Sequence, residues 1–304
     1  MSDFSIHTLG CGSAKPTLRH NPSSTVIDYR GNLFMIDCGE GTQVAFMRQR
    51  LNFSRLRHIF ITHAHGDHVL GLPGLISTLG LGGQGGRLTI HTLEPGYRFL
   101  TTVLSCFDDD LTFKIDYDVI RPEEAVIMET PSLTVRTIPL QHRVPTVGFV
   151  FEEKPKPRHL LGDMLDFHNV PVAVRPDLKW GTDFVKPDGT VIPNARLTTD
   201  PSPSLSYAHI SDTRYIPSIA EKIGPVDLLF HETTYLEESK SLAKKYFHST
   251  TIQAATVARD AGAKALLTGH YSARYPDCEE KFKEEAETVF PNVILNREGL
   301  VTKL

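Results

Sequence analysis

The chain has 304 residues, enough for one large α/β domain or two modest ones, and this length excludes a small scaffold held together by disulfides. Its hydrophobic fraction of 40% and charged fraction of 22% are ordinary for a globular protein, so wholesale disorder and a fibrous architecture are excluded. The 32 basic and 36 acidic residues give a net charge of -4, which argues against a protein that holds nucleic acid by bulk charge alone. Any contact with nucleic acid is expected to be local.

The first half of the chain is rich in predicted strands. Residues 4–9 alternate and residues 33–37 are nearly all apolar, as in a buried sheet, and both segments end at Gly-containing turns. Residues 56–62 form another apolar strand, and Pro73 after it is placed for the first turn of a helix. Further strands are expected at 88–92, 133–138 and 147–151, with turns between the first two.

Residues 152–204 differ in character from the rest of the chain. Eight of the twenty prolines lie here, at 155, 157, 171, 176, 187, 193, 201 and 203, and no apolar periodicity persists. Its basic and acidic side chains nearly balance, although the segment opens with the basic run KPKPR. We expect an inserted Pro-rich arm or long functional loop within a single domain that spans residues 1–304.

Strands and helices alternate after this arm. Strands are expected at 204–210, 226–230, 264–270 and 292–296, and helices at 216–223, 251–261 and 278–290. Gly262 is placed to end the second of these helices. The alternation predicts a layered α/β fold.

The cysteines and the N-terminus indicate in which cell compartment the protein is expected. Cys11, Cys38, Cys106 and Cys278 are widely scattered and form no CxxC pair, so we expect neither a disulfide framework nor a thiolate zinc site. A reducing, cytoplasmic location fits best. The N-terminus lacks a basic region followed by an apolar stretch, and the longest apolar stretch, near residues 70–81, is broken by Gly and Pro. No membrane span is expected.

The strongest local signal is the run His63-Ala64-His65-Gly66-Asp67-His68 after the apolar strand at 56–62. A loop allows its four ligand-type side chains to converge, and imidazole with carboxylate is a ligand set that Zn²⁺ accepts. The alternative is a solvated polar loop.

Two catalytic metal ions need about seven ligands, some of them shared, so further ligands must come from elsewhere in the chain. His142, Asp212 and His270 each follow an apolar strand-like run, at the same kind of sheet edge as the first cluster. Taken singly, each has an ordinary alternative, a capping Asp or a hydrogen-bonded core His. Their recurrence at strand ends favours a two-metal site.

Several motifs together resemble one family. They are LGCGSAKPT near the start, FMIDCGEGTQ, HGDHVLGLPGL, SDT, the His-Glu-Thr-Thr run at 231–234, His-Ser-Thr at 248–250 and AKALLTGHYSARY. With them, nearly the whole chain resembles the short form of tRNase Z (RNase Z) in the metallo-β-lactamase superfamily.

The resemblance implies a fold, an activity and a ligand set. The fold would be an αββα sandwich, in which two β-sheets pack face to face with helices outside. The activity would be that of a zinc-dependent endoribonuclease that removes the 3′ trailer from precursor tRNA by metal-hydroxide attack on a phosphodiester and leaves a tRNA 3′-hydroxyl. One zinc would be held by His63, His65 and His142, the other by Asp67, His68 and His270, with Asp212 bridging them. A homodimer is also implied.

Other side chains are candidates for catalysis and substrate binding. Asp67 is expected to orient the attacking hydroxide, and His248 to protonate the leaving ribose oxygen while Glu232 fixes its tautomer. Arg274 is a candidate clamp for a phosphate, with a surface ion pair as the alternative. Lys179 in the arm is a candidate tRNA contact, and the neighbouring Trp180 is either a stacking surface or a packing anchor.

Three alternative functions can be compared with this expectation. A small-molecule phosphodiesterase or another hydrolase of the superfamily would use the same site, and the nearly neutral arm supports this alternative. A β-lactamase is disfavoured because no cysteine lies beside His142, Asp212 or His270. A non-catalytic RNA-binding protein on this fold would have lost at least one ligand, whereas all seven are present.

Overall fold

The computed structural model describes residues 4–82, 86–106 and 111–304. The chain divides into two compact units. The first unit contains Met1–Met128, Val135–Phe151 and Ser206–Leu304, and the second contains Glu129–Thr134 and Glu152–Leu205.

The first sheet of the first unit has seven strands. Their order is β20 (Val301–Lys303), β1 (Phe4–Gly10), β3 (Ser24–Tyr29), β4 (Asn32–Ile36), β5 (Leu56–Phe60), β6 (Arg87–Leu93) and β7 (Lys114–Ile120). The pairs from β20 to β4 are antiparallel, and those from β4 to β7 are parallel. The carboxyl ends of β4 and β5 therefore meet at one edge of the sheet.

The second sheet also has seven strands. Their order is β19 (Val293–Ile294), β17 (Leu266–Leu267), β16 (Leu228–His231), β15 (Ser206–Ile210), β10 (Pro145–Glu153), β9 (Leu133–Gln141) and β8 (Val126–Glu129). Strands β15, β16, β17 and β19 are parallel to one another, so the segments that leave β15, β16 and β17 emerge on the same side.

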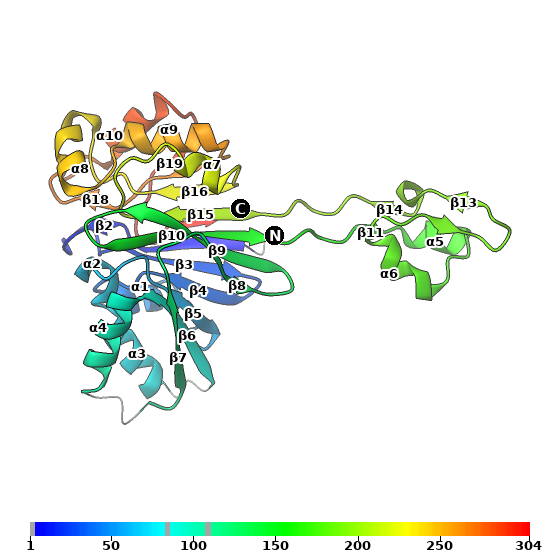
Figure 1. The fold of residues 1–304 in the computed structure, drawn as a ribbon, viewed down its shortest axis with the longest axis horizontal. Coiled ribbons are helices and arrows are strands. Elements are labelled where there is room, and N and C mark those ends of the chain that lie inside the picture. Colours follow the sequence, from blue (N-terminus) through cyan, green and yellow to red (C-terminus); the bar gives the residue numbers. More distant parts are fainter. Residues whose placement is uncertain (1–3, 83–85, 107–110) are drawn as a thin grey trace. The chain divides into compact units, whose positions relative to one another are not determined.

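Helices cover the outer face of each sheet (Figure 1). On the first sheet they are α1 (Thr42–Arg48), α3 (Leu72–Leu81) and α4 (Glu94–Leu104), and on the second α7 (Ile219–Ile223), α9 (Thr251–Ala261) and α10 (Glu279–Glu287). Separate apolar clusters lie under the two helical layers. Between the sheets, Phe60 packs edge-on against Phe149 and Phe151. This arrangement confirms the expected αββα sandwich.

Several elements of the first half were not predicted. Helix α4 and strand β7 lie between the strands expected at 88–92 and 133–138, where the sequence indicated only turns. Helix α4 buries Gly96, Leu100 and Leu104, so its apolar stripe is narrow and begins with a residue that has no side chain.

None of the described helices is long and apolar enough to cross a membrane.

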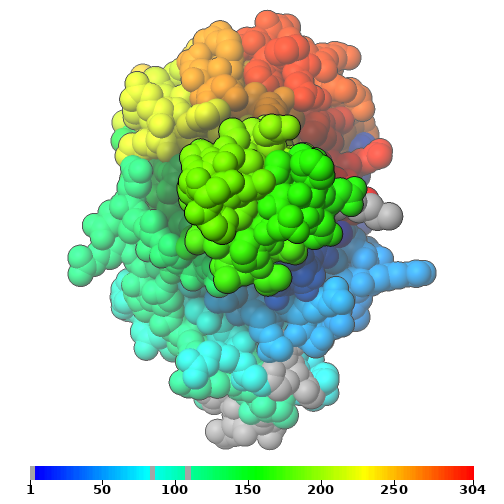
Figure 2. Space-filling view, turned by 90° about the vertical axis from the view of Figure 1, so that its right-hand side faces the viewer, coloured from blue at the N-terminus to red at the C-terminus, as the bar shows by residue number. Residues whose placement is uncertain are grey.

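The second unit has a small core of its own, although its sequence showed no apolar periodicity. Short strands pair as β11 (His159–Leu160) with β14 (Thr198–Thr199) and as β12 (Phe184–Val185) with β13 (Val191–Ile192). Its core is a cluster of the buried apolar side chains Leu165, Val170, Leu178, Phe184, Ile192 and Leu197. The earlier and later parts of this unit, green and yellow-green in Figure 2, pack against each other. Elements of only two to six residues are too short to show a hydrophobic period.

Candidate metal centre and active site

The side chains for which the sequence predicts a metal site all lie in the first unit, in the segments that follow its strands. His63 and His65 follow β5, Asp67 and His68 lie in the short helix α2 (Gly66–Val69), and His142, Asp212 and His270 follow β9, β15 and β17. Parallel strands place these segments at a common edge, so residues far apart in sequence are brought together.

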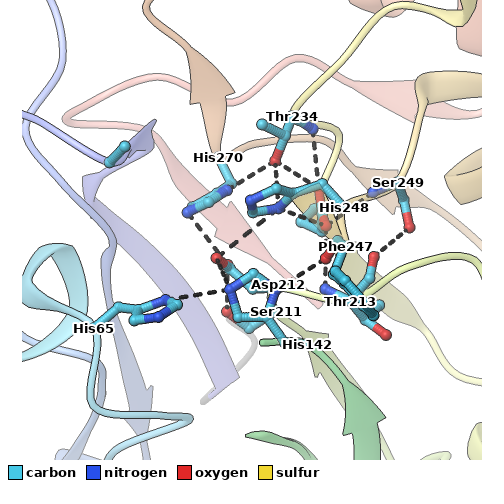
Figure 3. Close-up of polar contacts among 12 residues, drawn as sticks. His65, His142, Ser211, Asp212, Thr213, Thr234, Phe247, His248, Ser249 and His270 are labelled. Carbon is cyan, nitrogen blue, oxygen red and sulfur yellow. Dashed lines mark hydrogen bonds and ion pairs between the residues drawn. The ribbon is translucent and has the colours of Figure 1, made fainter. Parts of the chain in front are cut away.

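His63, His65 and His142 converge on one oxygen of Asp212. Nδ1 of His65 lies 3.1 Å from Nε2 of His63 and 3.2 Å from Nε2 of His142. Both Nε2 atoms lie 3.7 Å from Oδ2 of Asp212. The contacts of His142 with His65 and Asp212 are drawn in Figure 3. Three imidazole nitrogens and one carboxylate oxygen thus surround one point.

Asp67, His68 and His270 converge on the other oxygen of Asp212. Nε2 of His68 lies 3.5 Å from Oδ1 of Asp212 and 3.6 Å from Oδ2 of Asp67. Nε2 of His270 lies 3.2 Å and 3.5 Å from the same two oxygens. Asp212 therefore stands between two groups of ligand-type atoms, with one oxygen facing each.

The hydrogen bonds around the histidines leave their inward nitrogens free to bind a cation. Nδ1 of His68 donates to Asp37 at 2.7 Å, and Nδ1 of His142 donates to the carbonyl of Phe247 at 2.9 Å. Nδ1 of His270 donates to Oγ1 of Thr234 at 2.9 Å, because that hydroxyl itself donates to a carboxylate. In the neutral rings, Nε2 then carries a lone pair that points into the cluster.

Burial and charge also fit metal ions. The Nε2 atoms of His68 and His270 are buried and have no hydrogen-bond partner among the described residues. Burial lowers the pKa of His63, so that its ring is neutral and can bind a metal. Burial also opposes protonation of His68, yet Asp37 and the other nearby carboxylates raise the pKa of its ring to about 10. The site therefore attracts positive charge, and its donor set suits Zn²⁺.

Asp37 and Thr234 support the ligands but were not singled out from the sequence. Asp37 is fully buried directly after β4, and its Oδ1 accepts a hydrogen bond of 2.8 Å from the backbone N–H of Thr62. The same segment is fixed to α2, because the N–H of Cys38 donates to the carbonyl of His68 at 2.8 Å. Asp37 lies within the family motif FMIDCGEGTQ, which is the signal that could have found it.

Glu232 and His248 form the predicted pair beside this cluster. Nδ1 of His248 lies 3.0 Å from Oε1 of Glu232, which is completely buried. Burial lowers the pKa of His248, but the Glu232 carboxylate outweighs it and raises the pKa to about 9. His248 lies before α9, whose start is fixed by a capping box between Thr250 and Gln253.

A cavity of about 480 Å³ opens above the cluster. Its lining includes Ser13, Ala14, Lys15, His65, Asp67, His142, Arg143, Asp212, Tyr235, Tyr246, His248, Ser272 and Ala273. This volume is typical of a ligand pocket. The N–H of Ala14 donates to Oδ2 of Asp67 at 2.7 Å, so the loop that begins at Gly12 is held against the cluster.

The predicted substrate contacts lie outside the lining of this cavity. Arg274 is exposed and directly follows the lining residue Ala273, and its charge acts on the phenol of Tyr235, another lining residue. Lys179 belongs to the second unit, where its side chain is exposed and its carbonyl accepts a hydrogen bond from the N–H of Arg158.

Comparisons with known proteins bear out the fold and then the family. A family model described as anti-Pycsar protein Apyc1 matches residues 4–156. The chain is also similar to human tRNase Z, short form, with a TM-score of 0.71, 24% identity and 98% of each chain covered. It resembles the metallo-β-lactamase fold protein YhfI from Bacillus subtilis, with a TM-score of 0.71, 15% identity and full coverage of both chains. These two structures confirm the fold.

A relative at higher identity confirms the narrower resemblance. The ribonuclease Z of Parabacteroides distasonis is 50% identical over 301 residues, which cover 99% of each chain. This chain belongs to the ribonuclease Z family, whose members are tRNA 3′-processing endonucleases with a metallo-β-lactamase fold.

Proposed function

We propose that this chain is a zinc-dependent endoribonuclease that removes the 3′ trailer from precursor tRNA and leaves a 3′-hydroxyl on the tRNA. The observation that carries the proposal is the position of Asp212, whose two oxygens each face a separate group of ligand-type side chains. This arrangement occurs in a chain that is 50% identical to a ribonuclease Z over almost its full length.

We assign the ligands of two Zn²⁺ ions per subunit from the two groups. His63, His65 and His142 would hold one ion, Asp67, His68 and His270 the other, and Asp212 would bridge them. Bound there, the ions would lower the pKa of a water molecule and neutralise the charge that grows on the phosphate oxygens.

We assign to Asp67 the role of orienting the attacking water. Its Oδ2 accepts the hydrogen bond from Ala14 at the cavity wall. Although burial raises the pKa of Asp67, the neighbouring His68 and His270 lower it overall, so the group is a carboxylate near neutral pH. A carboxylate at this position accepts a hydrogen bond from the water and directs its lone pair at phosphorus.

We assign to His248 the role of supplying the proton that the reaction requires. When the bond between phosphorus and the ribose 3′-oxygen breaks, that oxygen leaves as an alkoxide unless it is protonated. His248 lines the cavity, and Glu232 holds its Nδ1. The imidazolium can then donate the proton on its other nitrogen to the leaving oxygen. Glu232 is a positioning residue, because no atom of it lines the cavity.

The second unit and Arg274 are assigned to substrate binding. We propose that the whole chain is a single catalytic domain and that the Pro-rich segment is an arm that contacts tRNA through Lys179 and Trp180. Both side chains are exposed in the second unit. Arg274 would contact a phosphate near the scissile bond. The homodimer and the cytoplasmic location expected from the sequence stay predictions, which sedimentation and cell fractionation would test.

The function is tested by offering two substrates to the zinc-loaded protein. One is a 3′-extended precursor tRNA and the other a simple aryl phosphodiester, and a His65→Ala variant serves as control. Cleavage of both substrates, lost in the variant, is the expected result. Cleavage of the aryl ester alone would overturn the tRNA assignment and favour the small-molecule phosphodiesterase, which uses the same metal chemistry.

A further inference from the structure

A second group of ligand-type side chains lies outside the catalytic cluster. Sγ of Cys11 lies 3.4 Å from Nδ1 of His20, and Oε2 of Glu298 lies 3.0 Å from the same nitrogen. Cys11 is buried, whereas the side chains of His20 and Glu298 are 14% and 23% exposed, so the group can be reached from solvent. All three residues belong to the first unit, and none is assigned to the catalytic site.

A further carboxylate orients the histidine of this group. Oε1 of Glu279 lies 2.8 Å from Nε2 of His20, and Oε2 of the same carboxylate lies 3.0 Å from the guanidinium of Arg19. When Nε2–H donates to Glu279, the lone pair of a neutral His20 lies on Nδ1, the nitrogen that faces Cys11 and Glu298. A carboxylate behind a histidine ring is the usual support for a metal-binding histidine.

We propose that Sγ of Cys11, Nδ1 of His20 and the carboxylate of Glu298 bind an additional Zn²⁺ ion, with Glu279 orienting His20 and water completing the coordination. Thiolate, imidazole and carboxylate are the three ligand types that Zn²⁺ takes in proteins. No sign of this site is visible in the sequence, because Glu298 lies far along the chain from Cys11 and His20 and the group includes one cysteine rather than a pair.

Two of the three distances between these ligand atoms resemble those within the catalytic cluster, and the third, between Cys11 and Glu298, is no more than 4.8 Å. Neighbouring ligand atoms in the catalytic cluster are 3.1 Å apart between His63 and His65 and 3.7 Å apart between His63 and Asp212. Around a tetrahedral zinc with its usual bond lengths, ligand atoms lie about 3.4 to 3.6 Å apart. The gap between Cys11 and His20 already matches, and that between His20 and Glu298 needs to widen by only a few tenths of an ångström.

At this site, protons compete with the metal ion for the ligand atoms. The hydrogen bond with Glu298 raises the pKa of His20 despite burial, and burial raises the pKa of the Cys11 thiol. Without a metal, the rival arrangement is an imidazolium held between Glu298 and Glu279 beside a neutral thiol. Binding of the ion displaces the thiol proton to solvent, so its affinity rises with pH.

The site is linked to the catalytic cavity by the loop between its ligands. Cys11 and His20 bracket the segment that carries Ser13, Ala14 and Lys15, which line the cavity. Within it, β2 (Gly12–Ser13) pairs with β18 (Tyr271–Ser272), directly after the catalytic ligand His270. An ion that joins Cys11 to His20 fixes both ends of this loop.

Cobalt substitution distinguishes this site from the catalytic one. The catalytic ligands are only histidines and aspartates, so a thiolate-to-Co²⁺ charge-transfer band in the near ultraviolet reports a cysteine ligand. We expect the full chain loaded with Co²⁺ to show this band. Cys11→Ser should abolish it and lower the metal content by one ion per chain, whereas Cys278→Ser, the matched control, should keep both.

Two further variants keep the test independent of folding and of the proposed function. Glu298→Gln keeps the thiol. Its affinity for Co²⁺, measured from the growth of the thiolate band, should be at least tenfold weaker. His65→Ala should lose catalytic metal while the band persists. Absence of the band in the Co²⁺-saturated chain, or its survival in Cys11→Ser, would overturn the additional site and favour the imidazolium arrangement. Neither outcome bears on cleavage of precursor tRNA.

Discussion

Oε1 of Glu232 lies 3.0 Å from Nδ1 of His248, and it also accepts hydrogen bonds from the backbone N–H groups of Thr213 and Ser249 at 3.1 and 2.9 Å. One buried carboxylate therefore joins the segment after β15 to the start of α9. Burial raises the pKa of Glu232, but the charge and the hydrogen bond of His248 lower it overall, so the carboxylate stays ionised inside the fold and holds Nδ1 of His248 while the ring borders the cavity.

Replacing His248 by Asn should lower kcat for precursor tRNA much more than kcat for the aryl phosphodiester. Without the acid, kcat for precursor tRNA should fall by about 10²- to 10⁴-fold, because the ribose oxygen is a poor leaving group. An aryl phosphodiester that releases nitrophenolate needs no proton, so its kcat should change little. Steady-state kinetics on both substrates measure the difference. Equal losses on both, at unchanged metal content, would show that His248 does not act as the acid.

Asp37→Asn should weaken metal binding without touching a ligand. The carboxylate accepts from Nδ1 of His68, and loss of such an outer partner typically costs about 10- to 100-fold in metal affinity or activity. Zinc affinity is measured by competition with a chromophoric chelator. Asp28→Asn, near the end of β3, is the matched control and should bind zinc as the parent does. Unchanged affinity in Asp37→Asn would contradict the supporting role.

The sequence singled out the proposed metal ligands more clearly than the residues that contact them. Histidines and aspartates directly after apolar runs are visible as a pattern, because strand ends place them at one edge of a sheet. Asp37 also directly follows an apolar run, but the sequence does not show that it supports a ligand, since this role depends on a contact across 31 positions with His68. Thr234 likewise acts through a contact with His270 that only the folded chain creates. The small core of the second unit could not be predicted because its short elements hold too few apolar residues to show a period.

Acid should destabilise the protein partly through His58. Its Nδ1 donates to Nε2 of His91 at 3.0 Å, and Nδ1 of His91 donates to Asp118 at 2.7 Å, so both rings are held neutral. Burial, together with the repulsion from His91 when that ring is protonated, lowers the pKa of His58 from 6.5 to about 4. Protonation therefore favours the unfolded chain. This contribution to stability is complete above pH 6.5 and is lost as the pH falls towards 4.

The measurement is the free energy of unfolding in urea at pH 7.5 and at pH 5, for the parent and for His58→Gln. The variant lacks the titrating ring, so the loss of stability between the two pH values should be smaller in the variant than in the parent. Buried histidines outside the pair of His58 and His91 titrate equally in both proteins and cancel in the comparison. An identical pH dependence in the two proteins would mean that His58 does not titrate in this range.

The double variant Lys179→Ala with Trp180→Ala tests the arm. Trp180 is 67% exposed, so it is no packing anchor and is free to stack on a base. For precursor tRNA we expect KM to rise several-fold. The slope of log KM against log salt concentration should become shallower by about one, because one phosphate contact is lost.

The catalytic site should be untouched by this change, so kcat for the aryl phosphodiester is expected to equal that of the parent. Lys283→Ala, on the exposed side of α10 in the first unit, is the matched loss of a lysine and should leave both KM and the salt slope unchanged. If the double variant raised KM without changing the salt slope, the contact would be stacking by Trp180 rather than charge from Lys179. If neither quantity moved, the arm would not contact tRNA at this position, and its nearly neutral charge would then agree with a weak electrostatic role.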